Sequence, residues 1–362
     1  MKHLELFSGI GGFRRAMELL SEDGVMTFQS IGYSEINHQA IQTYKANFNI
    51  GKDEISIGDI TLFEGMESLP HFDLLSAGFP CQTFSMMGRQ AGFDEERGQM
   101  FFHILSILSI HKPKYVLLEN VKNLKVHNKG RSLLRIQQEL EDIGYKVFYD
   151  IFNTSDFYLP QKRNRILIFA TTEDFPSELE WNFSAKEVAS FFERVHQKTS
   201  VSKYNTVCDV LSQKVHQKYY LSEKIKPTLL ADGSANFKSK SDINQIIARP
   251  LTATMHKMHR ACQDNYYSQD FIDSYGKINP VLTKTKEELA LLPIRKLTPE
   301  EAFMLQGFPS RFATESRKLG VSDGALYQQA GNAVSVNVIY AILYYLIANN
   351  IILDYYKRNK RY

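Results

Sequence analysis

Residues 4–13 of this chain read LELFSGIGGF. An apolar strand leads there into a turn that contains three glycines, and a helix is predicted to follow over 13–20. Glycine suits such a turn because it has no Cβ and adopts left-handed backbone conformations without strain. Strand, glycine turn and helix form the first unit of an α/β sheet, although the turn alone is a weak signal because any tight turn of this kind can use glycines.

The same alternation of strands and helices continues as far as residue 171. Six segments have the apolar composition of strands: 3–7, 28–34, 73–77, 115–119, 146–151 and 165–170. Segments with a helical pattern are 13–20, 38–47, 99–111 and 132–144. Strands that alternate with helices are typical of a doubly wound sheet, so the predicted fold class is α/β, with a mostly parallel, Rossmann-like sheet.

After residue 172 the alternation fades. Residues 183–293 are irregular and polar, with turn signals such as Ala-Asp-Gly-Ser at 231–234. A helical pattern returns over 298–305, where Thr298 and Glu301 have the spacing of a capping box, and again over 336–348. The sequence therefore predicts a large α/β unit, an irregular middle segment and a helical C-terminal segment.

The composition is that of a globular chain of 362 residues, 43% of them hydrophobic and 23% charged, enough for one large and one smaller domain. There are three cysteines, at 81, 208 and 262; so small and odd a number argues against a disulfide framework and fits a reducing compartment. No two have the CxxC spacing of a zinc site, so no metal is expected. We find no signal peptide and no apolar run of membrane-spanning length, and expect a cytoplasmic location.

The net charge is only +3, but basic residues are concentrated in the middle segment. Residues 224–260 contain seven Lys or Arg and two Asp or Glu, with two histidines in addition. Asn, Gln, Ser and Thr alternate with them, a composition that suits contacts with phosphates and base edges. The alternative is an ordinary solvated loop surface.

A second stretch of sequence points to chemistry. Residues 78–85 read GFPCQTFS and follow the apolar run 72–77, so Cys81 comes directly after a proline at the end of a predicted buried strand. Proline fixes its own φ and restricts the preceding residue, which holds the thiol as a nucleophile would be held. The alternative is a small, inert buried side chain, as free cysteines often are.

Charged residues accompany two other predicted strands. The strand 115–119 ends in Glu119, where open α/β sheets place their site residues. Residues 161–165 read QKRNR, and Arg163 and Arg165, at i and i+2, enter a strand on the same side. Without Cys81, an ordinary buried ion pair would be the better explanation for Glu119 and Arg165.

The chain resembles the cytosine-5 DNA methyltransferase family, and its compact length most resembles the bacterial restriction-modification members. The motifs that carry the resemblance are FSGIGG at 7–12, PCQ at 80–82, ENV at 119–121, QKRNR at 161–165, RKLTPEE at 295–301 with LQGFP at 305–309, and GNAVS at 331–335. The resemblance spans residues 4–338, nearly the whole chain. It implies a catalytic and cofactor-binding domain over 1–180, a smaller target-recognition domain over 181–294, and a return segment over 295–362 that completes the catalytic domain.

The resemblance also implies a reaction, the transfer of a methyl group from S-adenosylmethionine to C5 of a cytosine flipped out of duplex DNA. Cys81 would attack C6 and form a covalent adduct, and Glu119 would carry or share a proton with N3, which requires a raised pKa. Arg165 would donate to O2 of the cytosine, and Arg163 would orient Glu119 or a phosphate. Asn120 is expected to brace the backbone around the nucleophile.

The cofactor implied is S-adenosylmethionine. The turn of residues 9–12 would let the backbone approach its methionine part, Glu35 would bond the ribose hydroxyls at the end of the second strand, and Asp59 would read the adenine amine. The full set of cofactor-binding residues implied is Phe7, Gly9, Gly11, Gly12, Glu35, Ile36, Asp59, Ile60, Pro80, Asn332 and Val334.

Duplex DNA is the implied partner. Residues 85–93 carry two glycines and are expected to close over the flipped base as a lid, and the loops 231–240 and 251–260 are expected to read sequence. The DNA-contacting residues implied are Ser85, Met87 and Arg89 in the lid, and Asn236, Lys238, His256 and Arg260 in the loops. We also expect a functional pairing with a restriction endonuclease, a monomeric state and no membrane association.

Three other functions are weighed against these motifs. A tRNA cytosine-5 methyltransferase of the same family would carry a Cys-Phe-Thr motif, which this sequence lacks, and the QTFS after Cys81 is of the DNA type. A catalytically silent DNA-binding relative would be expected to have lost Cys81, Glu119 or Arg165. A nicotinamide-dependent oxidoreductase would explain the glycine turn and Glu35, but neither the Pro-Cys nor the Glu-Asn-Val element.

Overall fold

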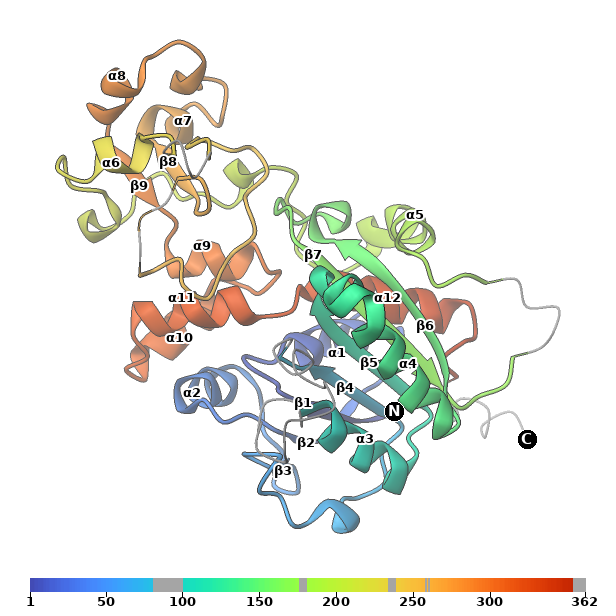
Figure 1. Cartoon of the computed structure of the whole chain (residues 1–362). Helices are drawn as coiled ribbons and strands as arrows, with labels where there is room; N and C mark the ends of the chain where they lie inside the picture. The colour runs from blue at the N-terminus through green and yellow to red at the C-terminus, as the bar shows by residue number, and fades with distance from the viewer. Residues whose placement is uncertain (81–99, 176–180, 234–238, 258, 260, 354–362) are drawn as a thin grey trace.

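The computed structural model describes residues 1–80, 100–175, 181–233, 239–257, 259 and 261–353. The described chain forms a large lobe built on a seven-stranded sheet and a smaller lobe beyond one end of that sheet (Figure 1). The expected site residues that lie outside the described residues are Cys81, Ser85, Met87, Arg89, Asn236, Lys238 and Arg260.

The sheet is mostly parallel, as the alternating pattern predicts. Its strand order is β3-β2-β1-β4-β5-β7-β6, and β7 alone runs antiparallel to its neighbours β5 and β6. The strands are β1 Lys2–Leu6, β2 Gln29–Tyr33, β3 Ile55–Ser56, β4 Leu74–Gly78, β5 Tyr115–Val121, β6 Lys146–Asn153 and β7 Asn164–Thr171. All six predicted strands are confirmed, and β3 was missed because two residues are too few to show a period. The order is that of a dinucleotide-binding sheet with an antiparallel strand inserted before the last, so the predicted Rossmann-like fold is confirmed.

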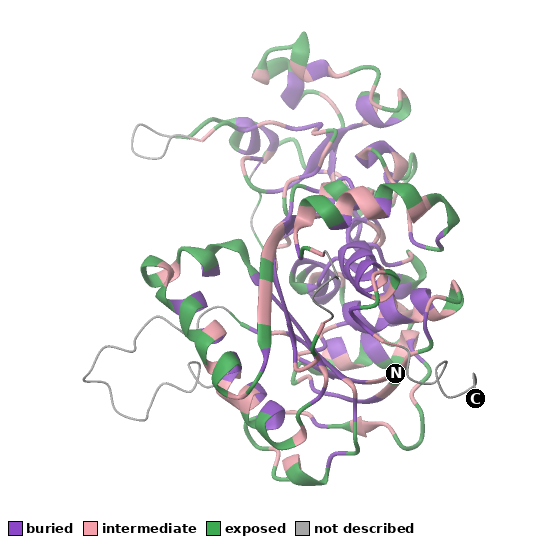
Figure 2. Ribbon diagram, turned by 90° about the vertical axis from the view of Figure 1, so that its right-hand side faces the viewer, coloured by how far each residue is buried: buried purple, intermediate pink, exposed green. Residues whose placement is uncertain are grey.

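Helices cover both faces of this sheet. In the large lobe they are α1 Gly12–Glu22, α2 His38–Asn47, α3 Met100–His111, α4 Arg131–Asp142, α5 Ala185–Val195 and α12 Val336–Ala348. The apolar sides of α3 and α4 share a core with one face of the sheet, and those of α1 and α12 share a core with the other. Figure 2 shows most strands buried between helices whose outer surfaces are exposed, while the edge strand β6 is largely half-buried or exposed. Short 3-10 helices are η1 Met66–Ser68, η3 Lys122–Lys125, η4 His127–Gly130, η5 Thr154–Phe157, η6 His196–Lys198, η7 Val207–Asp209, η8 Gln217–Tyr219 and η9 Pro280–Leu282.

The helix α5 packs with the large lobe. Phe183, Val188 and Phe192 lie in the same buried cluster as α1 and α12, and α5 contacts both α12 and β6. The domain boundary expected at residue 181 stays a prediction, and α5, which follows it, packs on the sheet of the large lobe. The polar, irregular pattern that begins near residue 172 hides one amphipathic helix whose apolar side still faces the sheet.

The smaller lobe has a core of its own, formed by buried side chains such as Leu221, Leu230, Ile243 and Tyr266. Its regular elements are the antiparallel pair β8 Tyr266–Ser268 and β9 Ile294–Lys296, and the helices α6 Lys226–Leu230, α7 Gln269–Asp273 and α8 Lys286–Ala290. Much of the remaining backbone there is irregular, as the sequence predicts.

The segment after β9 returns to the large lobe through α9 Pro299–Met304, α10 Arg311–Lys318 and α11 Asp323–Asn332. Thr298 and Glu301 form the predicted capping box at the start of α9. Both α10 and α11 contact α2 (Figure 1), so the return segment lies against the helix that follows β2.

One stretch, Asp323–Ala348, is long and apolar enough to cross a membrane by length and composition. This corrects the expectation that no apolar run reaches that length. The stretch consists of α11 and α12 with a short break between them, and 83% of its apolar window is buried inside the structure. Its composition is therefore explained by its place in the core of the large lobe.

Candidate active site

A cavity of about 410 Å³ lies at the carboxyl edge of the sheet. Residues at the ends of β1, β2, β4 and β5 or just beyond them border it, and the strand order reverses at β1, which is where open α/β sheets bind ligands. Because β7 is antiparallel, the residues around its start reach the same edge. The predicted site residues that line the cavity are Phe7, Gly9, Glu35, Ile36, Pro80, Glu119, Arg163, Arg165 and Asn332.

The glycines after β1 have two different roles. Gly9 lines the cavity with a φ of +54°, and no atom lies within 4 Å of the place where its Cβ would be. A Cβ on Gly11 would lie 2.3 Å from the ring of Phe48, and one on Gly12 would lie 2.4 Å from a methyl carbon of Val334. Gly11, Gly12 and Val334 are not among the residues that line this cavity, and their expected contact with the cofactor stays a prediction.

Glu35 is held rigidly at the end of β2. Its carboxylate accepts hydrogen bonds from the backbone N–H groups of Gly9, Ile36 and Asn37 at 2.8, 2.9 and 2.8 Å. Phe7, with a φ of +53°, turns the chain so that Gly9 reaches this carboxylate. A carboxylate has about four acceptor positions, so Glu35 retains capacity to accept a hydrogen bond from a ligand in the cavity.

Two further residues expected to bind the cofactor are not among those that line the cavity. Asp59 accepts hydrogen bonds from the backbone N–H and the hydroxyl of Thr61, at 2.9 and 2.8 Å. Ile60 is buried in the core between the sheet and α3 and α4. Both follow the short strand β3, and their expected contact with the cofactor stays a prediction.

Glu119 and Arg165 form the charged centre of the site. Leu167 is the direct partner of Glu119 across β5 and β7, and Arg165 lies two residues before it on the same face. The distance from Arg165 Nε to Glu119 Oε1 is 3.0 Å. Burial raises the pKa of Glu119, and the guanidinium groups of Arg165 and Arg163 oppose this rise without cancelling it. The expected rise of this pKa is therefore confirmed in direction.

Asn120 fixes the backbone that leads toward residue 81. Its Nδ2 donates to the carbonyl oxygen of Phe79 at 2.9 Å, and its Oδ1 accepts from the N–H of Val121 at 2.8 Å. Phe79 immediately precedes Pro80, which lines the cavity. The expected bracing role is thus confirmed as far as the described residues extend.

Arg163 has an environment different from the one expected. Its side chain is buried and donates to the carbonyl oxygens of Leu251, Gly331 and Ala333, at 3.0, 3.1 and 2.9 Å. None of its hydrogen bonds within the described residues goes to Glu119, and its Nε has no partner there. Arg163 therefore ties the segment at Leu251 to the turn that borders the cavity, which makes it a positioning residue.

Gln161 extends this junction, and sequence reasoning gave it no role. Its Nε2 donates to the carbonyl oxygen of Leu305 at 3.0 Å, and its Oε1 accepts from the N–H of Leu251 at 2.9 Å. Next to it, the backbone of Pro160 and Lys162 exchanges hydrogen bonds with Ala248. The QKRNR motif thus joins the large lobe, the smaller lobe and the return segment immediately beside the cavity.

His256 is the one expected DNA-contacting residue among those described. A Cβ on Gly324 would lie 3.4 Å from the ring of His256, so this histidine packs against the first turn of α11. Burial and the nearby charges of Lys257 and Lys296 lower its pKa, and its Nδ1 has no partner within the described chain. A neutral imidazole offers one donor and one acceptor.

Asn37 and Gln329 also line the cavity, although sequence reasoning did not select them. Asn37 caps α2 by accepting from the N–H groups of residues 39 and 40, and its polar side chain directly before a helical pattern was an available signal. Gln329 accepts a hydrogen bond from Thr43 at 2.8 Å, while its buried Nε2 has no partner within the described residues. Nothing in the local sequence pattern marks that glutamine.

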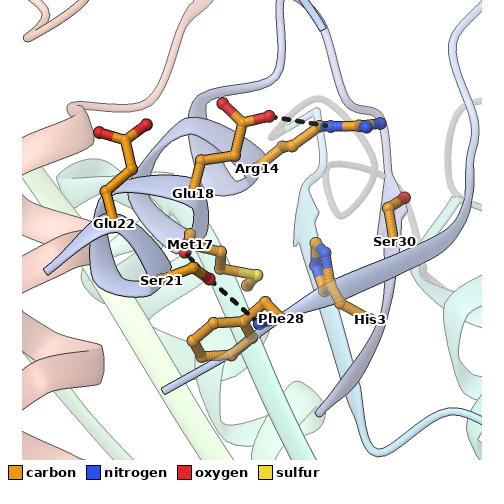
Figure 3. Close-up of a pocket in the computed structure, with 8 residues that line it drawn as sticks. All are labelled: His3, Arg14, Met17, Glu18, Ser21, Glu22, Phe28 and Ser30. Atoms are coloured by element: carbon orange, nitrogen blue, oxygen red, sulfur yellow. Dashed lines mark hydrogen bonds and ion pairs between the residues drawn. The ribbon is translucent and has the colours of Figure 1, made fainter. Parts of the chain in front are cut away.

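A second cavity of about 300 Å³ lies beside α1, near the beginnings of β1 and β2 (Figure 3). Arg14 is paired there with Glu54 and Glu18. The Nε2 of His3 lies 2.7 Å from the hydroxyl of Ser76, and burial lowers the pKa of His3 to about 3, so this ring is neutral. Arg14 and His3 thus each have partners already, Arg14 with two glutamates and His3 with Ser76. We therefore assign this cavity no part in the chemistry.

Comparison with known proteins identifies the family of this chain. The family model of the C-5 cytosine-specific DNA methylases matches residues 1–348. The type II methyltransferase M1.ScrFI of Lactococcus lactis subsp. cremoris is 36% identical over 342 residues, covering 94% of this chain and 76% of that protein. The type II methyltransferase M.HpaII of Haemophilus parainfluenzae is 34% identical over 364 residues, covering 93% and 87%.

Among solved structures, the Dnmt2 methyltransferase of S. pombe superposes with a TM-score of 0.73, covering 98% of this chain and 100% of that one. The two sequences are 21% identical, so this likeness shows the fold alone. The family match runs through every element that borders the cavity. We conclude that this chain belongs to the C-5 cytosine-specific DNA methylases of the restriction-modification type, enzymes that transfer a methyl group from S-adenosylmethionine to C5 of cytosine in DNA.

Proposed function

We propose that this enzyme methylates a cytosine flipped out of a specific duplex sequence, through a covalent bond between Cys81 and C6 of the base. One observation carries the proposal. Glu119 is a buried carboxyl with a raised pKa, 3.0 Å from Arg165, and it lies near the end of β5, where it pairs with Gly78 of the strand that leads to Cys81. A carboxyl whose pKa is raised, next to a fixed cation, suits the proton transfer and charge stabilisation that activate a cytosine ring for attack.

In the proposed reaction the thiolate of Cys81 forms a bond to C6, and the ring electrons move to N3, which takes the proton of Glu119. Arg165 donates to O2, where negative charge develops. C5 is then enamine-like, and its electron pair takes the methyl group that S-adenosylmethionine supplies. Transfer of the C5 proton to water, return of the N3 proton to Glu119 and departure of the thiolate from C6 then restore the aromatic ring and the free enzyme.

The residues around the cavity fit S-adenosylmethionine. Glu35 keeps an acceptor position for the ribose hydroxyls. Ile36 leaves 70% of its surface exposed at the cavity, where with Phe7 it would cover the adenine ring. Gln329 offers an unpaired buried donor. Asn332 and Pro80 would close the pocket. We also propose that Asp59 accepts a hydrogen bond from the adenine amine.

For DNA we propose that the smaller lobe reads sequence, with His256 and the loops 231–240 and 251–260 facing the bases and nearby lysines facing phosphates. The hydrogen bonds of Arg163 and Gln161 to Leu251 support a fixed position for the second loop relative to the cavity. We further propose that the enzyme acts as a monomer in the bacterial cytoplasm and protects sites that a partner endonuclease cleaves.

Bisulfite sequencing of DNA from cells that express this chain tests the proposal. The expected result is protection of one cytosine position in a single recurring sequence, lost when Cys81→Ser replaces the wild type. Protection scattered without a common sequence would contradict sequence-specific recognition. Protection by the Cys81→Ser variant would contradict covalent catalysis.

A further inference from the structure

A basic segment follows the catalytic strand β5 directly. Residues 121–131 read VKNLKVHNKGR and contain Lys122, Lys125, Lys129 and Arg131 but no Asp or Glu. All four basic side chains are exposed. Within the described residues none of them forms an ion pair, whereas Arg135, one turn further along α4, is paired with Glu139. The segment therefore presents a concentrated positive charge that no neighbouring carboxylate neutralises.

The fold fixes this segment at the mouth of the active site. Val121 is the last residue of β5 and lines the cavity together with Glu119. The following helix η3 packs against β7 and is anchored by Leu124, which is fully buried. Lys122 and Lys125 flank that anchor, so they project outward from the same edge of the sheet at which the cytosine must enter.

The backbone of the segment is also held in an uncommon form. Asn128, Lys129 and Gly130 have successive φ values of 49°, 57° and 82°. A lysine in the left-handed region is unfavourable, and such conformations persist where the surrounding structure imposes them, often at functional sites. Here the turn separates η3 from α4 and keeps Lys129 exposed at the surface.

We propose that Lys122, Lys125, Lys129 and Arg131 bind phosphates of the duplex on the large-lobe side, within a few nucleotides of the target cytosine. This segment, the 122–131 grip, would hold the DNA backbone opposite the smaller lobe while the base enters the cavity. Phosphate contacts position a duplex without reading its sequence. The inference rests on the proposed action on duplex DNA and adds a second anchoring surface to it.

The test compares two double variants of the grip with a control of equal charge change. The grip variants are Lys122→Gln with Lys125→Gln, and Lys129→Gln with Arg131→Gln. The control is Lys112→Gln with Lys146→Gln, because these lysines lie before β5 and at the start of β6, at the opposite edge of the sheet. Each protein is titrated with a short target duplex at several salt concentrations, and S-adenosylmethionine binding is measured alongside to verify that the pocket is intact.

Each phosphate contact contributes about 0.9 to the slope of log K against log salt, so two lost contacts should flatten the slope by about 1.8. The loss of affinity relative to wild type should then be about tenfold larger at about 50 mM salt than at about 200 mM. The control should keep the wild-type slope. If both grip variants match the control in affinity and slope, the inference is wrong. If the wild-type chain itself fails to bind the duplex, the proposed function is wrong, and the inference fails with it.

Discussion

Replacing Arg163 by methionine should destabilise the chain and weaken S-adenosylmethionine binding together. The guanidinium satisfies three buried carbonyl oxygens, those of Leu251, Gly331 and Ala333. A buried polar group left without a partner costs roughly 1–3 kcal/mol. Three such groups set an upper limit of about 9 kcal/mol, but two effects lower the expected value.

The first effect is that burial of the charged guanidinium already costs free energy in the wild type, because the group loses its contact with water; the same burial lowers the pKa of Arg163 to about 9. Methionine removes that cost, and local relaxation or water can satisfy part of the freed carbonyl groups. We therefore expect a net loss of about 3–5 kcal/mol, the range for breaking a buried charged contact. Because Gly331 and Ala333 line the cavity, cofactor affinity should fall as well.

The assays are denaturant unfolding and calorimetric titration with S-adenosylmethionine. Arg163→Lys keeps a cation at the position and should recover part of both losses. Arg194→Met is the matched control, because Arg194 is exposed on α5. If Arg163→Met unfolded within about 0.5 kcal/mol of wild type, the ordinary range for surface changes, and bound the cofactor equally well, the positioning role would be refuted.

Three further predictions concern carboxyl groups. Glu119→Gln should lower the single-turnover rate by about 10²-fold or more, with cofactor affinity nearly intact. The wild-type rate should fall as pH rises through the raised pKa of Glu119. A pH-independent rate would count against the proton-donor role. Burial raises the pKa of Glu5 from 4.5 to about 8, so the contribution of protonated Glu5 to the free energy of unfolding is full below pH 4.5 and is lost as pH rises through 8. Glu5→Gln should flatten this fall in the free energy of unfolding. A pH profile that the substitution leaves unchanged would show that Glu5 stays ionised. Glu35→Ala and Asp59→Ala should each weaken S-adenosylmethionine binding by about 1–3 kcal/mol, measured by calorimetry, and unchanged affinity in both would mean that the pocket is misplaced.

Sequence reasoning located the sheet and the chemistry because both depend on local patterns. Apolar runs marked the six longer strands, and the polar residues at the ends of two of them proved to border one cavity, since parallel strands end at a common edge. The rise in the pKa of Glu119 was expected from the proton transfer that the family resemblance implies, and burial of the carboxyl is its physical cause.

The rest depended on contacts between distant segments. The role of Arg163 is set by carbonyl groups about 90 and 170 residues further along the chain, which no local pattern reveals. The sequence around Gly11 and Gly12 is that of a cofactor-binding turn. It does not reveal that Phe48 and Val334 pack so closely against these glycines that no Cβ would fit. Gln329 reaches the cavity only because α11 packs on α2.

The central claim is that Cys81 forms a covalent bond to C6 of a cytosine, and a duplex with 5-fluorocytosine at the target position tests it most directly. Fluorine at C5 cannot leave as a proton does, so the reaction should stop with the base bonded to the enzyme. With S-adenosylmethionine present, wild type should give a denaturation-resistant complex whose cross-linked peptide contains Cys81. The Cys81→Ser variant should bind the same duplex and give none. A complex that persists in that variant, or a wild-type enzyme that methylates cytosine but traps no complex, would contradict the account.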